Sequence, residues 1–251
     1  MPGAFRKISD ASILLLIFFL AKSALSIAVR SSTAKFFGAG DESDAYFAAF
    51  TVPQQISDFF IGGILFLVII PVFLKRKAET DEETALKDVA GLLNLAATAL
   101  LAVTALYFIF IPEIISFVFP GFKGAKLELA ISLSRLFSPA LILMGLSVVY
   151  ISFYHAYREF LVPSLASLLF PLASLFSLWA LPPEWGIDRL VYGNLAGCLA
   201  GLAIMVALIQ KRVRWQWNWN FRNPLVVQSL ILAWPVLING TVSKVIPFVQ
   251  K

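Results

Sequence analysis

The chain has 251 residues, of which 59% are hydrophobic and only 14% are charged, well below the roughly 25% of charged residues usual in soluble domains. This composition excludes an ordinary soluble domain and indicates a polytopic membrane protein. The net charge of +5 does not indicate a nucleic-acid partner, because the lysines and arginines stand in short clusters between apolar runs, where they orient a chain in a membrane. A single cysteine, Cys198, excludes a disulfide or a cysteine-only metal site within the chain.

An α-helix needs about 20 mostly apolar residues to cross the hydrocarbon of a bilayer, and this length identifies the candidate spans. Seven segments meet it, so the expected fold is an all-α bundle of transmembrane helices. They run over residues 11–29, 45–74, 88–112, 130–154, 160–181, 190–210 and 227–249. A cleaved signal peptide is the alternative for the first segment, but its apolar run extends to Val29, which is longer than the apolar region of a signal peptide.

The loop charges predict the orientation of the chain. If the N-terminus is cytoplasmic, eleven lysines and arginines fall on the cytoplasmic side and five on the other, and cytoplasmic loops carry an excess of basic residues. The eleven are Arg6, Lys7, Lys75, Arg76, Lys77, Lys87, Arg158, Lys211, Arg212, Arg214 and Arg222. The five are Arg30, Lys35, Lys123, Lys126 and Arg189. We therefore expect a multi-pass membrane protein with a cytoplasmic N-terminus.

The longest polar stretch, residues 75–88, lies between the second and third predicted spans. It begins with three basic residues and continues with the acidic residues Glu79, Asp81, Glu82 and Glu83. Because acidic side chains complement the dipole at a helix N-terminus, this stretch is predicted to be a solvated connector that ends in a helix start.

Prolines and glycines within the spans indicate how the helices pack. Pro53 and Pro139 each remove a backbone hydrogen bond from a predicted span, which favours kinked helices around a cavity. Gly193, Gly197 and Gly201 recur every four residues in the span 190–210. This spacing predicts a face that packs closely against another helix.

Charged side chains inside the hydrocarbon cost about 2.5–3.5 kcal/mol each on insertion scales, so they mark candidate functional sites. Four such residues stand out: Lys22, Asp58, Arg135 and Lys244. For Lys22 and Asp58 two interpretations stay open, a polar cavity for a charged headgroup or a structural ion pair between neighbouring helices. Arg135 is expected to extend to the outer interface. The depth of Lys244 depends on where its span ends.

The residue groups that serve soluble enzymes are absent from the sequence. His155 is the only histidine, so neither a Ser-His-Asp triad nor a multi-histidine metal site is available. The glycines Gly38 and Gly40 are not followed by the lysine of an ATP-binding P-loop. We therefore expect that the chain is not an enzyme and has no cofactor.

The segment that joins the first two predicted spans carries a specific pattern. It reads Phe37-Gly38-Ala39-Gly40, Asp44-Ala45-Tyr46-Phe47-Ala48-Ala49-Phe50 and Val52-Pro53-Gln54, followed by Gly63 and Pro71-Val72-Phe73. These residues resemble the signature between the first and second helices of the MurJ/MviN lipid II flippases, within the superfamily of multidrug, oligosaccharidyl-lipid and polysaccharide exporters. The segment 114–122 resembles the family's outer loop. The resemblance covers nearly the whole chain but only the N-terminal half of the family.

The resemblance implies the N-terminal lobe of a fourteen-helix flippase. Such a protein moves the lipid-linked peptidoglycan precursor lipid II across the bacterial inner membrane by alternating access. The expected domains are a six-helix lobe, residues 1–222, and a seventh helix, residues 223–251, that begins a linker to a second lobe. Seven helices are an odd number for paired repeats, so we expect a fragment or a truncated gene product. The expected partners are a lipid-linked saccharide diphosphate, membrane lipids and cell-wall synthesis proteins.

The resemblance also implies gating residues. Asp44 matches the family's acidic residue at the start of the second helix, where it helps to gate the outer side. Gly38, Gly40 and Pro53 are the expected hinges about which the lobes rock.

The residues expected to bind substrate are Lys22, Arg30, Gln54 and Asp58. The resemblance implies arginines beside the position of Lys22 and at the positions where this chain has Ser57 and Asp58. A guanidinium group binds a diphosphate better than an ammonium group does, because it can donate two parallel hydrogen bonds. Asp58 repels a diphosphate. Two alternatives to lipid II transport therefore stay open: an exporter of another polyprenyl-linked saccharide, and a non-transporting truncated membrane protein.

Overall fold

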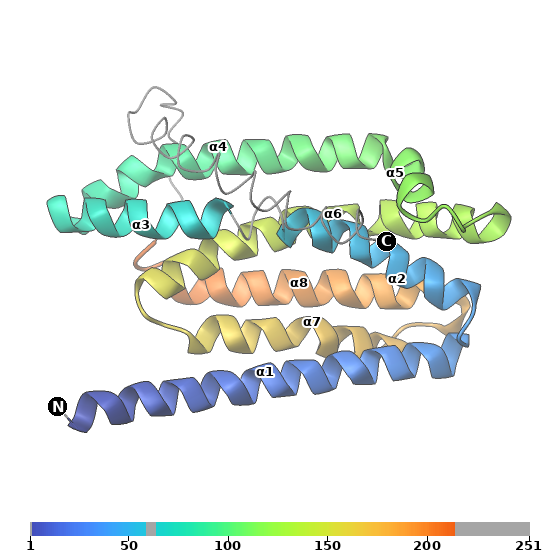
Figure 1. Ribbon diagram of the computed structural model, residues 1–251, viewed down its shortest axis with the longest axis horizontal. Helices are drawn as coiled ribbons and strands as arrows, with labels where there is room; N and C mark the ends of the chain where they lie inside the picture. Colours follow the sequence, from blue (N-terminus) through green and yellow to red (C-terminus); the bar gives the residue numbers. More distant parts are fainter. Residues whose placement is uncertain (1, 59–63, 214–251) are drawn as a thin grey trace, which may run out of the picture.

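The computed structural model describes residues 2–58 and 64–213, and these ranges contain helices and no strand. The helices are α1 (Pro2–Phe37), α2 (Asp41–Ser57), α3 (Ile64–Glu79), α4 (Glu82–Ile109), α5 (Ile111–Val118), α6 (Gly124–Ala156), α7 (Leu161–Ala180), the 3-10 helix η2 (Pro183–Trp185) and α8 (Asp188–Ile209). The long helices run along the long axis of the molecule, with α1 below α7 and α8 and with α4 at the opposite side (Figure 1). The predicted all-α bundle is confirmed.

Five helices in the described part are long and apolar enough to cross a membrane. These segments are Leu15–Phe37, Glu82–Ile109, Gly124–Ala156, Leu161–Ala180 and Asp188–Ile209. They correspond to the first, third, fourth, fifth and sixth predicted spans. The predicted seventh span and Lys244 lie outside the described residues, as does the predicted linker helix.

The second predicted span and the predicted outer loop differ from the structure. Two helices, α2 and α3, lie where a single span over 45–74 was expected, and residues 59–63 between them are outside the described part. Within the predicted loop 114–122, residues up to Val118 belong to α5. Pro112 stands in the first turn of α5 and is compatible with a helix start, because the N–H that proline lacks would have no partner there.

The connector between α3 and α4 is shorter than predicted, because α3 continues to Glu79. Asp81 caps α4: its carboxylate accepts hydrogen bonds from the Thr84 hydroxyl at 2.7 Å and from the Thr84 backbone N–H at 3.0 Å. These two hydrogen bonds lower the pKa of Asp81, since they favour its charged form. The predicted helix start with acidic residues in its first turn is confirmed, since Glu82 and Glu83 begin α4, but the connector is reduced to Thr80 and Asp81.

The apolar core has two parts, and α6 contributes to both. One part is centred on Phe73, Phe153 and Tyr154, where α3, α4, α6 and α8 meet. The other is centred on Phe137 and Leu190 and also includes residues of α2 and α5. Because α6 contacts α2, α3, α4, α5 and α8, it is the helix around which the described bundle is organised.

The glycine face of α8 packs directly on α7. A Cβ atom at Gly197 would lie 2.7 Å from the Leu169 carbonyl oxygen and from the Phe170 Cα atom. A Cβ atom at Gly193 would lie 2.7 Å from the Ala173 carbonyl oxygen. Real Cβ atoms do not approach backbone this closely, so only glycine allows the two helices to reach this distance. The predicted close packing is confirmed.

An ionic network joins three connections at one end of the bundle. Lys77 forms an ion pair with Glu82 at 2.6 Å, and the Tyr157 hydroxyl donates a hydrogen bond to Glu82 at 2.5 Å. Arg212, after α8, pairs with Glu159 at 2.6 Å. Burial and the nearby Glu82 carboxylate raise the pKa of Tyr157, so its hydroxyl stays protonated and donates. The network ties the α3–α4 and α6–α7 connections to the end of α8.

Candidate functional site

A cavity of about 550 Å³ is lined by residues of α1, α2, α6, α7 and α8 together with Asp58. This volume is in the range of ligand-binding sites in proteins. Three charged side chains line it: Lys22 and Arg30 from α1, and Asp58 at the end of α2. Hydroxyl groups such as those of Ser147 and Ser167 add polar atoms to a wall that is largely apolar and aromatic.

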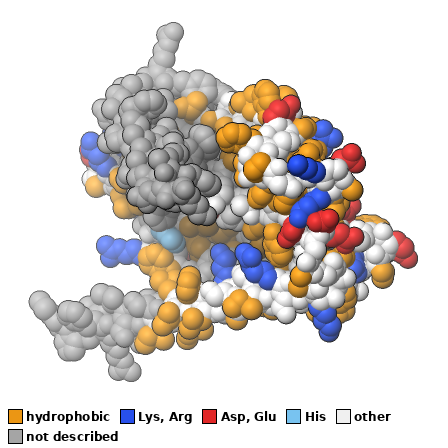
Figure 2. All heavy atoms as spheres, turned by 45° about the vertical axis from the view of Figure 1, so that its right-hand side comes forward, with side chains coloured by type: hydrophobic (Ala, Val, Ile, Leu, Met, Phe, Trp, Pro, Cys, Tyr) orange, Lys and Arg blue, Asp and Glu red, His pale blue; other side chains and the backbone are white. Residues whose placement is uncertain are grey.

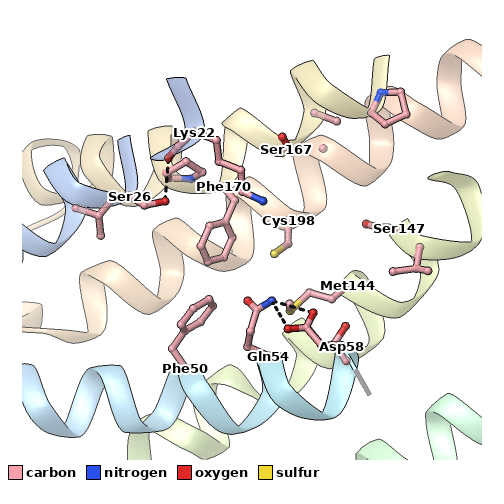
Figure 3. A pocket seen from close by; sticks show the side chains of 18 of the residues that line it. Lys22, Ser26, Phe50, Gln54, Asp58, Met144, Ser147, Ser167, Phe170 and Cys198 are labelled. Atoms are coloured by element: carbon pink, nitrogen blue, oxygen red, sulfur yellow. Dashed lines mark hydrogen bonds between the residues drawn. The ribbon is translucent and has the colours of Figure 1, made fainter. Parts of the chain in front are cut away.

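The structure brings the four predicted substrate-binding residues together at this cavity, since Lys22, Arg30, Gln54 and Asp58 all line it. Figure 3 shows Lys22 on α1 and, across the cavity from it, Gln54 and Asp58 on α2. Among the described residues, Lys22 and Asp58 form no ion pair with each other or with other side chains. Of the two interpretations left open by the sequence, the arrangement matches the polar cavity. The binding roles themselves stay predictions.

Gln54 and Asp58 form a unit on one face of α2. The Gln54 side-chain amide donates to both carboxylate oxygens of Asp58, at 3.2 and 3.3 Å. The Asp58 backbone N–H in turn reaches the Gln54 carbonyl, so the two residues lie one helical turn apart. This pair holds the carboxylate at the cavity wall in a defined orientation (Figure 3).

Arg30 is held at the α1–α2 side of the cavity by an aromatic ring. Its guanidinium carbon lies 5.0 Å from the centroid of the Phe47 ring, which is a cation–π distance. Lys22 lies two turns earlier on α1, and Ser26 lies between them and also lines the cavity. The α1 wall of the cavity therefore carries the positive charge.

The predicted hinge residues differ in their local geometry. Gly38 has a φ of +76°, a left-handed conformation that favours glycine, and its carbonyl accepts a hydrogen bond from the Ser43 hydroxyl at 2.5 Å. Gly40 is the N-cap of α2 and has extended backbone, with φ −137° and ψ −157°. Pro53 is buried within α2. Only Gly38 shows a conformational need for glycine.

Asp44, the predicted gating residue, pairs with a residue that the sequence analysis counted only as a loop charge. Lys126 of α6 lies 2.6 Å from Asp44 and 3.1 Å from Asp41, and its ammonium group lies 4.5 Å from the Phe122 ring centroid. The charged side chains gather on the end of the molecule that carries the α1–α2 and α5–α6 connections (Figure 2). Lys126 thereby joins the first turn of α2 to the first turn of α6.

Sequence analysis missed the structural roles of two further polar residues. Asn194 of α8 donates a hydrogen bond at 2.6 Å to the hydroxyl of Tyr46, which lines the cavity. Arg189, counted above as a loop charge, is buried and donates to the carbonyls of Leu178 at 2.9 Å and Gly186 at 3.0 Å. No local sequence pattern predicts either set of contacts.

The other ionisable residues singled out from the sequence lie outside the cavity lining. Arg135 is an exposed residue of α6, and its predicted extension to the interface stays a prediction. His155 packs against Phe160 with tilted rings, whose centroids are 4.9 Å apart.

A sequence model of the family described as "Lipid II flippase MurJ" matches residues 33–250. The chain belongs to the MurJ family. The probable lipid II flippase MurJ of Aquifex aeolicus (strain VF5) is 31% identical over 210 residues, which are 79% of this chain and 39% of that protein. The probable lipid II flippase MurJ of Buchnera aphidicola subsp. Schizaphis graminum (strain Sg) is 30% identical over 138 residues, 54% of this chain and 27% of that protein.

A solved structure supports the same MurJ fold. "Lipid II flippase MurJ, inward closed conformation" superposes with a TM-score of 0.72 at 22% identity, covering 93% of this chain and 48% of that chain. The predicted family is confirmed, and with its membrane-length helices and bacterial relatives the chain is a multi-pass protein of a bacterial membrane. The chain spans less than half the length of these MurJ relatives.

Proposed function

We propose that this chain forms one lobe of a flippase that moves lipid II across the bacterial inner membrane by alternating access. The observation that carries the proposal is the 550 Å³ cavity, with Lys22 and Arg30 on its α1 wall, in a chain of the MurJ family. The lobe carries out transport without covalent chemistry. We place the N-terminus in the cytoplasm because of the loop charges, and count cell-wall synthesis proteins among the partners.

The cavity charge suits an anionic lipid headgroup. Lys22 and Arg30 stand eight residues apart on one face of α1, so their Cα atoms are separated by about 12 Å. This spacing lets one residue contact a diphosphate while the other contacts a neighbouring part of the headgroup. The lipid tail stays in the bilayer, whose hydrocarbon matches the apolar outer faces of the helices.

The start of α2 is where we propose that the outer side opens and closes. Gly38 supplies the left-handed turn between α1 and α2, and Lys126 ties Asp44 to α6. In the opening movement the Lys126 contacts break, and α2 shifts about Gly38 and Pro53 relative to α6, with which it shares a buried core. The exposed carboxylates keep the energetic cost of this opening low.

Asp58 favours a second candidate substrate, another polyprenyl-linked saccharide. The Asp58 carboxylate lies in the cavity, where it repels a phosphate group. The cations of α1 need only a diphosphate to bind, so the rest of the headgroup can differ from that of lipid II. This candidate keeps the transport mechanism and changes the saccharide.

The proposed function is tested by complementation of a bacterial strain depleted of its lipid II flippase. The full reading frame is expressed, and its insertion in the membrane is measured by immunoblotting of membrane fractions. Rescue of growth supports lipid II transport. Absence of rescue at normal membrane levels contradicts it and favours another polyprenyl-linked saccharide.

Lys22→Ala is expected to lower the flipping rate at least about tenfold, because it removes a charge-assisted hydrogen bond to the headgroup, and to leave membrane insertion unchanged. Lys35→Ala is the matched control, since Lys35 is an exposed lysine of the same helix outside the cavity lining. Equal flipping by the two variants would remove Lys22 from the mechanism.

A further inference from the structure

Asp58 is the only carboxylate among the residues that line the cavity in the described part of the chain. An ionised carboxylate is costly in surroundings from which water is excluded unless it has a partner. Lys22 and Arg30 line the same cavity but make no ion pair with it, and the other described lysines and arginines make none either. The contacts among the described residues therefore leave the charge of Asp58 without an opposite charge.

The neighbours of Asp58 orient the carboxylate without neutralising it. Gln54 donates to both of its oxygens from one amide group, and an amide carries no net charge. A carboxylate can accept about four hydrogen bonds, so it keeps acceptor positions for a donor in the cavity. Its residue is exposed, and it faces the cavity opposite Lys22 (Figure 3).

The charges of the cavity fall into two groups on two helices. Lys22 and Arg30 on α1 match the negative charges that a lipid-linked diphosphate carries on its two phosphates. Asp58 on the α2 side then has no group of opposite charge in this arrangement, and it repels any anionic part of the headgroup that approaches. A headgroup that carries an ammonium group in addition to its diphosphate can pair with both helices, because its phosphates face the cations of α1 and its ammonium group faces Asp58.

We propose that Asp58, held by Gln54, is a specificity-determining residue that binds an ammonium group on the saccharide or peptide part of a lipid-linked diphosphate. The inference rests on the proposed function and names a chemical group of its substrate. An ammonium group donates charge-assisted hydrogen bonds to a carboxylate and cancels its charge, whereas a hydroxyl or acetamido group donates a hydrogen bond but leaves the charge uncompensated.

The test compares two substrates that differ in one charge. Protein from the full reading frame is reconstituted in proteoliposomes with a polyprenyl-diphosphate-linked saccharide that bears one free amino group, or with its N-acetylated counterpart. We expect the wild type to transport the amino form about tenfold faster at low substrate concentration, the effect of one charge-assisted hydrogen bond. Asp58→Asn is expected to abolish this preference by slowing the amino form, and Asp58→Lys to reverse it.

Glu113→Gln is the matched control, because it removes one carboxylate charge from an exposed site on α5 outside the cavity lining. It should keep the wild-type preference. The inference is overturned if the wild type transports both forms equally, or if Asp58→Asn keeps the preference. Transport of neither form by wild-type protein that does rescue the flippase-depleted strain would also overturn the inference, whereas absence of both transport and rescue would contradict the proposed function itself. Gel filtration of each variant verifies folding, and Asp58→Glu, which keeps the charge, should retain the preference.

Discussion

The two ends of the described bundle are held together in different ways. At the end where α2 begins, the ion pairs between α2 and α6 all involve Lys126 among the described residues, and its partners Asp41 and Asp44 are 76% and 59% exposed. At the other end, the partly buried Tyr157 joins an ionic network with Lys77, Glu82 and Arg212. Exposed ion pairs contribute little stability, whereas a network around a partly buried ring contributes more. The comparison agrees with our proposal that the outer side opens at the start of α2, and it leads us to expect that the opposite end stays closed.

The largest effect is expected at Tyr157. Tyr157→Ala removes the hydrogen bond to Glu82 and the ring beneath Lys77, and should lower the free energy of unfolding by about 2–3 kcal/mol. Tyr157→Phe keeps the ring and should cost only about 1 kcal/mol. Thermal unfolding in detergent measures both variants. Equal losses for the two variants would show that the ring contributes nothing to the network.

An intermediate effect is expected at Gly38 in the turn that leads to α2. Gly38→Ala forces a side chain into a left-handed conformation and should cost about 1 kcal/mol of stability. Gly121→Ala is the control, because its Cβ atom would also meet open space but its φ is not positive. Chemical denaturation compares the two. If both variants unfold alike, the left-handed turn stores no strain and Gly38 is not needed there.

The smallest effect is expected for the Lys126 ion pair. A double-mutant cycle with Lys126→Met and Asp44→Asn should give a coupling energy of about 0.5 kcal/mol, because Asp44 is exposed. The same cycle with Lys123→Met, at an exposed lysine three residues earlier, should give no coupling. A coupling as large as that between Tyr157 and Glu82 would contradict the difference between the two ends.

Much of the helical structure could be predicted from the sequence, since hydrophobic length is a local property. The predicted spans 160–181 and 190–210 agree with α7 and α8 within two residues at each end. The segment 45–74 was the least predictable, because its apolar run does not reveal that two helices, α2 and α3, occupy it. The prediction of a loop over 114–122 was wrong in its first half, because Pro112 was not recognised as a residue in the first turn of a helix.

The candidate site was likewise predictable only in part from the sequence. Lys22 and Asp58 could be identified one by one, because a charge within an apolar run is visible without a structure. Their common cavity could not be identified in this way, since it depends on how α1 and α2 pack against α6, α7 and α8. Lys126 gave no signal at all, because a lysine near a helix start is ordinary until its position opposite Asp44 is known.

The sequence by itself determined the membrane character, the main spans, the family resemblance and the glycine face of α8. Each of these depends on composition or on spacing within one segment. Only the tertiary structure decided which charges share a cavity, that Asn194 reaches Tyr46 and that Arg189 is buried. The physical reason is that these contacts join residues far apart in the chain, and their geometry follows from helix packing, which no short segment encodes.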